Sequence, residues 1–131
     1  AYSRGVRSIN LDQPLETALH ATLNTFQSSF PICDEGKLVG MLPYQSLVEA
    51  LEKKSVQTPI REVMTRDVQA VSPSDSLIEI QMKMSTSRID ALPVVENEEF
   101  LGMITSQDLN EVYRLSMALD GPNRDRKLQK A

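Results

Sequence analysis

The sequence has few of the residues on which covalent cross-links and metal sites depend. Its 131 residues include one cysteine, Cys33, and one histidine, His20. A single cysteine excludes an intrachain disulfide framework and fits a reducing compartment. His20 has no Cys, Asp or Glu at metal-ligand spacing on both sides, and the sequence supplies no neighbouring base for Cys33. We therefore expect no metal site, no required cofactor and no cysteine-based catalysis.

Long apolar runs and clusters of basic residues are also missing. The apolar runs, such as residues 101–105, fall far short of the roughly 20 residues that a membrane span needs, so this chain is not expected to insert into a membrane. The net charge is −4, and residues 121–131, with four basic side chains against one acidic, leave −7 on residues 1–120. An acidic body argues against a nucleic-acid partner.

No targeting signal opens the chain. Residues 1–4 carry neither an initiator methionine nor a signal-peptide pattern. We therefore expect a piece of a longer protein, located in the cytoplasm or forming the cytosolic part of a membrane protein. The charged tail, residues 119–131, is expected to be disordered.

The strongest signal in the sequence is an internal duplication. Residues 15–51 can be laid over residues 77–113 without a gap, at a constant shift of 62. So many matches in one register indicate two copies of one unit. The identical pairs are Leu15/Leu77, Pro31/Pro93, Gly40/Gly102, Met41/Met103, Gln45/Gln107, Leu47/Leu109 and Glu49/Glu111.

Each copy predicts the same order of elements, β-α-β-β-α. Apolar residues at i, i+3, i+4 and i+7 predict helices that begin near Leu15 and Leu77. Asp12 and Ser74 are their expected N-caps, and Pro14 suits the first turn. The expected strands are 6–9, 30–33, 38–41, 68–71, 92–95 and 100–104, and the expected second helices are 44–51 and 106–118.

The two copies should fold together. Neither can bury both faces of a three-stranded sheet with two helices, so we expect an α/β (α+β) fold in which two sheets pack face to face about a pseudo-twofold axis. The expected units are residues 1–57 and 58–118, the second with a lead-in helix over 59–65.

Residues 91–96 (ALPVVE) and 100–109 (FLGMITSQDL) resemble the signature of CBS domains, named after cystathionine β-synthase. Residues 58–65 resemble the run that precedes such a motif, and residues 30–34 and 38–47 repeat the pattern. The resemblance implies a non-catalytic tandem pair that regulates an attached parent domain, associates as a homodimer, and in many members binds AMP, ADP, ATP or S-adenosylmethionine.

A narrower similarity concerns the parent protein. Residues 29–32 and 58–64 are similar to CBS pairs that follow site-two-protease-like intramembrane metalloproteases. The alternative to ligand sensing is a ligand-free module that dimerises or positions its parent chain.

The resemblance points to Thr105 and Asp108 as ligand residues. In nucleotide-binding members a Thr or Ser opens the last helix, and an Asp three residues later accepts hydrogen bonds from both ribose hydroxyls. Leu11 and Met103 would enclose the adenine. By position in the motif, the same cleft would also include Gln107, Ala91, Asp90, Ser28 and Asn10.

Two considerations limit this site. Thr-x-x-Asp before an apolar run is also a capping box, so capping and ligand binding both stay open. The first copy carries Pro43 and Ser46 at the corresponding positions, which predicts one occupied cleft instead of two. Asp90 would repel phosphate and favours AMP, or a neutral or cationic adenosine compound, over ATP.

Overall fold

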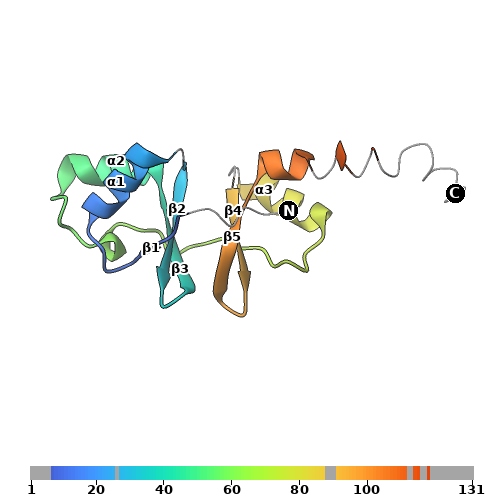
Figure 1. Ribbon diagram of the computed structural model, residues 1–131, viewed down its shortest axis with the longest axis horizontal. Helices are drawn as coiled ribbons and strands as arrows, with labels where there is room; N and C mark the ends of the chain where they lie inside the picture. The colour runs from blue at the N-terminus through green and yellow to red at the C-terminus, as the bar shows by residue number, and fades with distance from the viewer. Residues whose placement is uncertain (1–6, 26, 88–90, 112–113, 116–117, 119–131) are drawn as a thin grey trace, which may run out of the picture.

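The computed structural model describes residues 7–25, 27–87, 91–111, 114–115 and 118. Figure 1 shows two halves that each combine strands with helices, and the expected α+β class is confirmed. In the described part of the first half lie β1 (Ile9–Asn10), α1 (Leu15–Asn24), β2 (Ser29–Asp34), β3 (Lys37–Pro43) and α2 (Tyr44–Lys53). The described part of the second half contains α3 (Leu77–Ser87), β4 (Ala91–Glu96), β5 (Glu99–Thr105) and a last helix of which residues 106–111, 114–115 and 118 are described.

The duplication is visible in strand pairing. Pro31 pairs with Met41 in the β2–β3 hairpin and Pro93 pairs with Met103 in the β4–β5 hairpin, and a register shift occurs at the same place in both. β1 runs parallel to β2, while in the second half Val71 forms an isolated parallel bridge with β4. The expected strand over 68–71 is thus reduced to this bridge.

The two hairpins meet at their tips. Lys37 of β3 pairs with Glu99 of β5, which gives a five-stranded sheet with the order β1-β2-β3-β5-β4. Two further backbone hydrogen bonds, from Leu38 N to Glu98 O at 3.1 Å and from Phe100 N to Gly36 O at 3.0 Å, reinforce the junction. The expected separate sheets are therefore continuous at this point.

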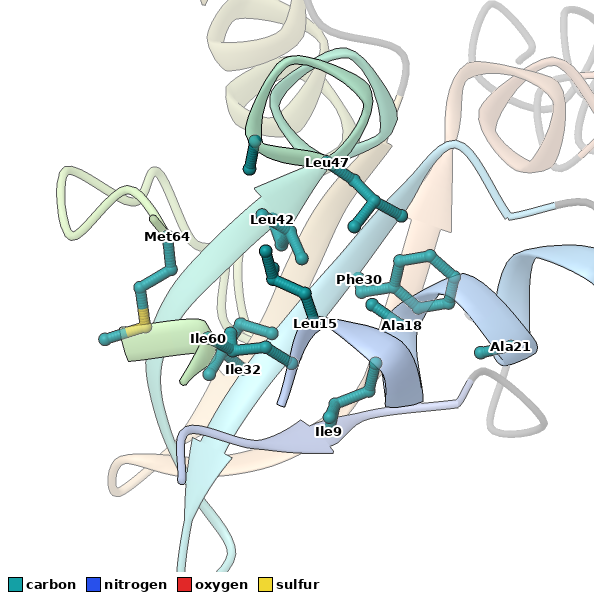
Figure 2. Packing of buried hydrophobic residues seen from close by; sticks show 11 residues of the cluster. Ile9, Leu15, Ala18, Ala21, Phe30, Ile32, Leu42, Leu47, Ile60 and Met64 are labelled. Atoms are coloured by element: carbon teal, nitrogen blue, oxygen red, sulfur yellow. The ribbon is translucent and has the colours of Figure 1, made fainter. Parts of the chain in front are cut away.

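Each half has its own hydrophobic core on one face of its hairpin. In the first, Leu15 and Ala18 of α1 and Leu47 of α2 pack against Phe30 and Leu42 (Figure 2). A second cluster joins α3 and the last helix to β4 and β5. The buried side chains that belong to neither cluster include Pro31, Met41, Pro93 and Met103, so the other face of each hairpin is covered as well. The helices lie on the outer sides of the paired hairpins (Figure 1).

The expected N-caps were wrong. Pro14 occupies the cap of α1, and the first free N–H groups, of Leu15 and Glu16, donate to the carbonyl oxygens of Thr58 at 2.8 Å and Val56 at 2.9 Å. At α3, Ser76 instead of Ser74 forms the cap. A carbonyl supplied by a neighbouring segment can satisfy a helix start as a side chain does, and local sequence does not reveal it.

The lead-in to the second copy packs on the first half. Its helix is shorter than expected, a 3₁₀ turn at η1 (Ile60–Glu62). Ile60 and Met64 nevertheless belong to the first core (Figure 2). The backbones of Met41 and Thr65 exchange two hydrogen bonds of 2.9 Å. The two copies are therefore interlocked. None of the described helices has the length and apolar character needed to cross a membrane.

Candidate functional site

Thr105 and Asp108 form a capping box at the end of β5. The backbone N–H of Thr105 donates to Asp108 Oδ2 at 2.9 Å, and the N–H of Asp108 donates to Thr105 Oγ1 at 3.0 Å. The two bonds satisfy N–H groups at the start of the last helix, and a carboxylate there also suits the helix dipole. The capping interpretation is confirmed, and both side chains are half-buried.

Capping leaves part of each side chain available. Among the described residues, Asp108 Oδ1 accepts no hydrogen bond and the Thr105 hydroxyl donates none. The carboxylate is thus held in one orientation through Oδ2 while Oδ1 can accept a ligand hydroxyl. One pair of residues can therefore both start the helix and bind a ligand, so the cap does not exclude the second role.

Four of the other expected site residues belong to the second copy, on or next in sequence to β4, β5 and the last helix. Ala91 pairs directly with Thr105 across β4 and β5, and Met103 is buried two residues before Thr105. Gln107 is exposed on the first turn of the last helix. Asp90 lies outside the described residues, so the structure does not test its effect on phosphate binding.

Asn10 and Leu11 do not lie with Thr105. Asn10 pairs with Cys33 near the tip of the first hairpin and lines a hollow with Phe100. Phe100 stands five residues before Thr105 on β5, a distance of about 16 Å at the usual rise of a strand. Because β1 runs parallel to β2, its end reaches the hairpin tips, whereas Thr105 is at the other end of β5. The expected enclosure of the adenine by Leu11 and Met103 stays a prediction.

Ser28 belongs to the first-half counterpart of the site. Its carbonyl oxygen accepts the N–H of Tyr44 at 2.9 Å, at the start of α2. Pro43 is the N-cap there and makes no side-chain cap hydrogen bond, and the Tyr44 side chain is 47% exposed. The first half thus offers no carboxylate where the second offers Asp108, as the sequence indicated.

Among the residues that the structure describes, Cys33 and the acidic side chains show no catalytic arrangement. Burial raises the pKa of the Cys33 thiol, and a hydrogen bond with Ser8 opposes that shift only in part. A neutral buried thiol is a poor nucleophile. Within the described ranges, no group of three or more His, Cys, Asp or Glu side chains is placed to hold a metal ion.

Two hollows at the hairpin tips were not foreseen. One, of about 430 Å³, lies beside Lys37, Val68 and Val95, and the other, of about 360 Å³, lies beside Ser8 and Phe100. The internal repeat could have indicated the two hollows, because the shift of 62 relates residues that line one hollow to residues that line the other. No local sequence motif predicts either hollow.

Comparison with known proteins identifies the repeat unit. A model of the CBS domain matches residues 2–53 and 60–114. A crystal structure of the Vibrio cholerae protein AcuB is 30% identical, with a TM-score of 0.78 and 90% of each chain covered. The CBS domain pair of protein MJ0100, solved in complex with 5′-methylthioadenosine and S-adenosyl-L-methionine, is 26% identical, with a TM-score of 0.73, and the match covers 88% of this chain and 93% of that one.

Two curated relatives are considerably longer proteins. A Thermofilum pendens protein encoded in a ribosomal RNA operon is 34% identical over 73 residues, which is 56% of this chain and 24% of the relative. The L-aspartate semialdehyde sulfurtransferase of Methanocaldococcus jannaschii is 33% identical over 85 residues, which is 63% of this chain and 16% of that enzyme. The matched region is thus about a quarter or less of these relatives.

Proposed function

This chain belongs to the CBS domain family and is a regulatory CBS pair, and we propose that it senses an adenosine-type ligand through Thr105 and Asp108. The observation that carries the proposal is the geometry of Asp108. Its Oδ2 is fixed by the N–H of Thr105, while its Oδ1 has no hydrogen-bond donor among the described residues. A half-buried carboxylate oriented in this way suits a ribose diol, because charge-assisted hydrogen bonds are stronger than neutral ones.

The class of ligand follows from charge. The body of the chain is acidic, and the sequence places Asp90 directly before Ala91, which pairs with Thr105. Anionic phosphates are disfavoured beside carboxylates. We therefore favour AMP, S-adenosylmethionine or 5′-methylthioadenosine over ADP or ATP. The complex of the MJ0100 pair with two such compounds supports this choice.

Calorimetric titration of the chain with AMP, ATP, S-adenosylmethionine and 5′-methylthioadenosine tests the proposal. Asp108→Asn should weaken binding about 10-fold or more, since hydrogen bonds to a charged group contribute about 1.5–3 kcal/mol each. The matched control is Glu79→Gln, because Glu79 and Ser76 form the equivalent capping box at α3, with bonds of 2.8 and 3.1 Å. Equal losses in both variants, or no binding by the unaltered chain, would contradict a ligand role for Asp108.

A second candidate function, dimerisation of the parent chain, is supported by an exposed apolar face. Ile78 and Met82 stand one turn apart on α3 with 68% and 63% of their surface exposed, and Leu115 of the last helix is exposed too. The corresponding residues of the first copy are Glu16, His20 and Lys53. Exposed apolar patches mark interaction sites, so we propose a homodimer through the second-half helices.

Sedimentation tests the dimer proposal. Under the dimer proposal, Met82→Glu should make the chain monomeric, while Leu23→Glu, at a still more exposed residue on α1, should leave the oligomeric state unchanged. A chain that is strictly monomeric at high concentration would overturn it. Ligand binding at Asp108 does not depend on the outcome.

We propose that the parent protein contains a further domain that this CBS pair regulates. We also propose that the pair lies in the cytoplasm. The similarity of residues 29–32 and 58–64 supports a site-two-protease-like membrane metalloprotease as that parent. Sequencing the coding region on both sides tests this. A His-Glu-x-x-His motif within apolar spans is expected. Flanking sequence without it would overturn the assignment.

A further inference from the structure

The two hairpin tips meet through a junction that repeats the symmetry of the sequence. The N–H of Leu38 donates to the carbonyl oxygen of Glu98 at 3.1 Å, and the N–H of Phe100 donates to that of Gly36 at 3.0 Å. The shift of 62 exchanges these two bonds, since it relates Leu38 to Phe100 and Gly36 to Glu98. The two copies therefore hold one another at this junction by equivalent backbone groups.

The junction is small and exposed to solvent. Within the residues that the structure describes, Lys37 and Glu99 are the one pair in register between β3 and β5. Residues 34–37 and 96–99, which form the two tips, are all exposed, and none of them belongs to either core. A few hydrogen bonds at an exposed site, without buried apolar contacts, open at a lower free energy than a core does. The junction is therefore the part of the sheet that opens most readily.

One of the two tips holds a residue in a backbone conformation that favours glycine. Each loop has two consecutive residues with positive φ, Glu35 (52°) and Gly36 (84°) in the first hairpin and Asn97 (53°) and Glu98 (71°) in the second. Hairpin loops of this kind prefer Asn followed by Gly. Gly36 adopts its φ without steric cost, whereas the β-carbon of Glu98 is crowded by the backbone. The closed junction therefore keeps Glu98 under strain.

We propose that this junction is a clasp that opens and closes while both cores stay folded. When the tips part, the N–H groups of Leu38 and Phe100 lose their acceptors and Glu98 is free to return to negative φ. The copies stay joined in the open state, because the lead-in remains bonded to β3 through Met41 and Thr65. The clasp gives the pair two arrangements of its halves, and a regulatory module requires two such states.

Amide hydrogen exchange of the complete chain, followed by NMR, tests the clasp. The amides of Leu38 and Phe100 should exchange about 100-fold or more faster than those of Leu42 and Ile104, which are buried on the same two strands. Low concentrations of urea should hardly change the rates at the tips, since local opening exposes little surface. Glu98→Gly should slow exchange about 3- to 10-fold, because glycine removes the strain of the closed state. The factor should be the same at both amides, which lie on different hairpins but are released together.

Glu98→Gln is the matched control, because it keeps the strain and removes only the charge that lies 3.5 Å from Lys37 Nζ. That ion pair is exposed and contributes little, so exchange should change by less than about 2-fold. Tip amides as protected as the core amides, slowing at Leu38 alone, or equal effects of Glu98→Gly and Glu98→Gln would overturn the clasp. The measurement needs no ligand, so its failure is distinct from a failure of adenosine binding at Asp108.

Discussion

Gly40 lies against Met64 so closely that a β-carbon at residue 40 would stand 2.8 Å from Met64 Sδ and 2.8 Å from the carbonyl oxygen of Thr65. Real β-carbons do not approach other atoms at that distance. The glycine therefore allows the lead-in of the second copy to pair with β3 of the first. It shows why an interlocked pair of copies needs a residue without a side chain at this point.

Gly40→Ala should destabilise the chain by about 1–3 kcal/mol, as overpacking of a closed contact does. The measurement is the free energy of unfolding in urea. In a double-mutant cycle with Met64→Ala, the two losses should be less than additive, because truncation of Met64 removes one of the two clashes. Fully additive losses would show that there is no steric coupling between residues 40 and 64.

Ile60→Ala should cost about 2–5 kcal/mol, the usual loss for a buried isoleucine. Ile60 is fully buried in the first core although the repeat assigns it to the second copy. Leu23→Ala is the control, since Leu23 is 74% exposed and its loss should stay within about 0.5 kcal/mol. Hydrogen exchange in Ile60→Ala should accelerate in α1, whose cap depends on the same segment. Protection of α1 equal to that of the unaltered chain would contradict the interlocked core.

The internal repeat predicted the fold because equivalent residues of the two copies are buried in equivalent positions. Pro31 and Pro93, or Met41 and Met103, recur in equivalent pairs in the structure because the same strand register buries both. Thr105 and Asp108 were predictable for a similar reason, since a capping box is a local pattern.

The rest depends on contacts between distant segments. The side chain of Asp12 pairs with Arg61 at 2.5 Å instead of capping α1, because the carbonyl groups of Val56 and Thr58 reach that helix first. Asn10 lies near the hairpin tips because β1 runs parallel to β2, a direction that its own sequence does not specify. The hollows form only where both halves meet, so no single stretch of sequence encodes them.

Thr105→Ala should cost about 1 kcal/mol, the typical value for a lost N-cap side chain. The N–H of Asp108 would lose its acceptor, and the first turn of the last helix would be less stable. Ser76→Ala at α3 should cost a similar amount, because Ser76 Oγ accepts the N–H of Glu79 in the same way. Thermal or urea unfolding of both variants makes the comparison. A negligible loss in Thr105→Ala alone would indicate that the capping box contributes nothing there.

Cys33 should make stability fall at alkaline pH. Burial raises the pKa of its thiol above the ordinary value of 9.0. As the pH rises through 9.0, the thiol of the unfolded chain ionises first, so the folded state binds more protons than the unfolded state and the free energy of unfolding decreases. Cys33→Ala removes this dependence. Its unfolding free energy, measured from pH 7 to 10.5, should run parallel to that of the unaltered chain below pH 8 and decline less steeply above pH 9. Parallel curves over the whole range, or a steeper decline in Cys33→Ala, would mean that the thiol ionises at least as readily in the folded state as in the unfolded one.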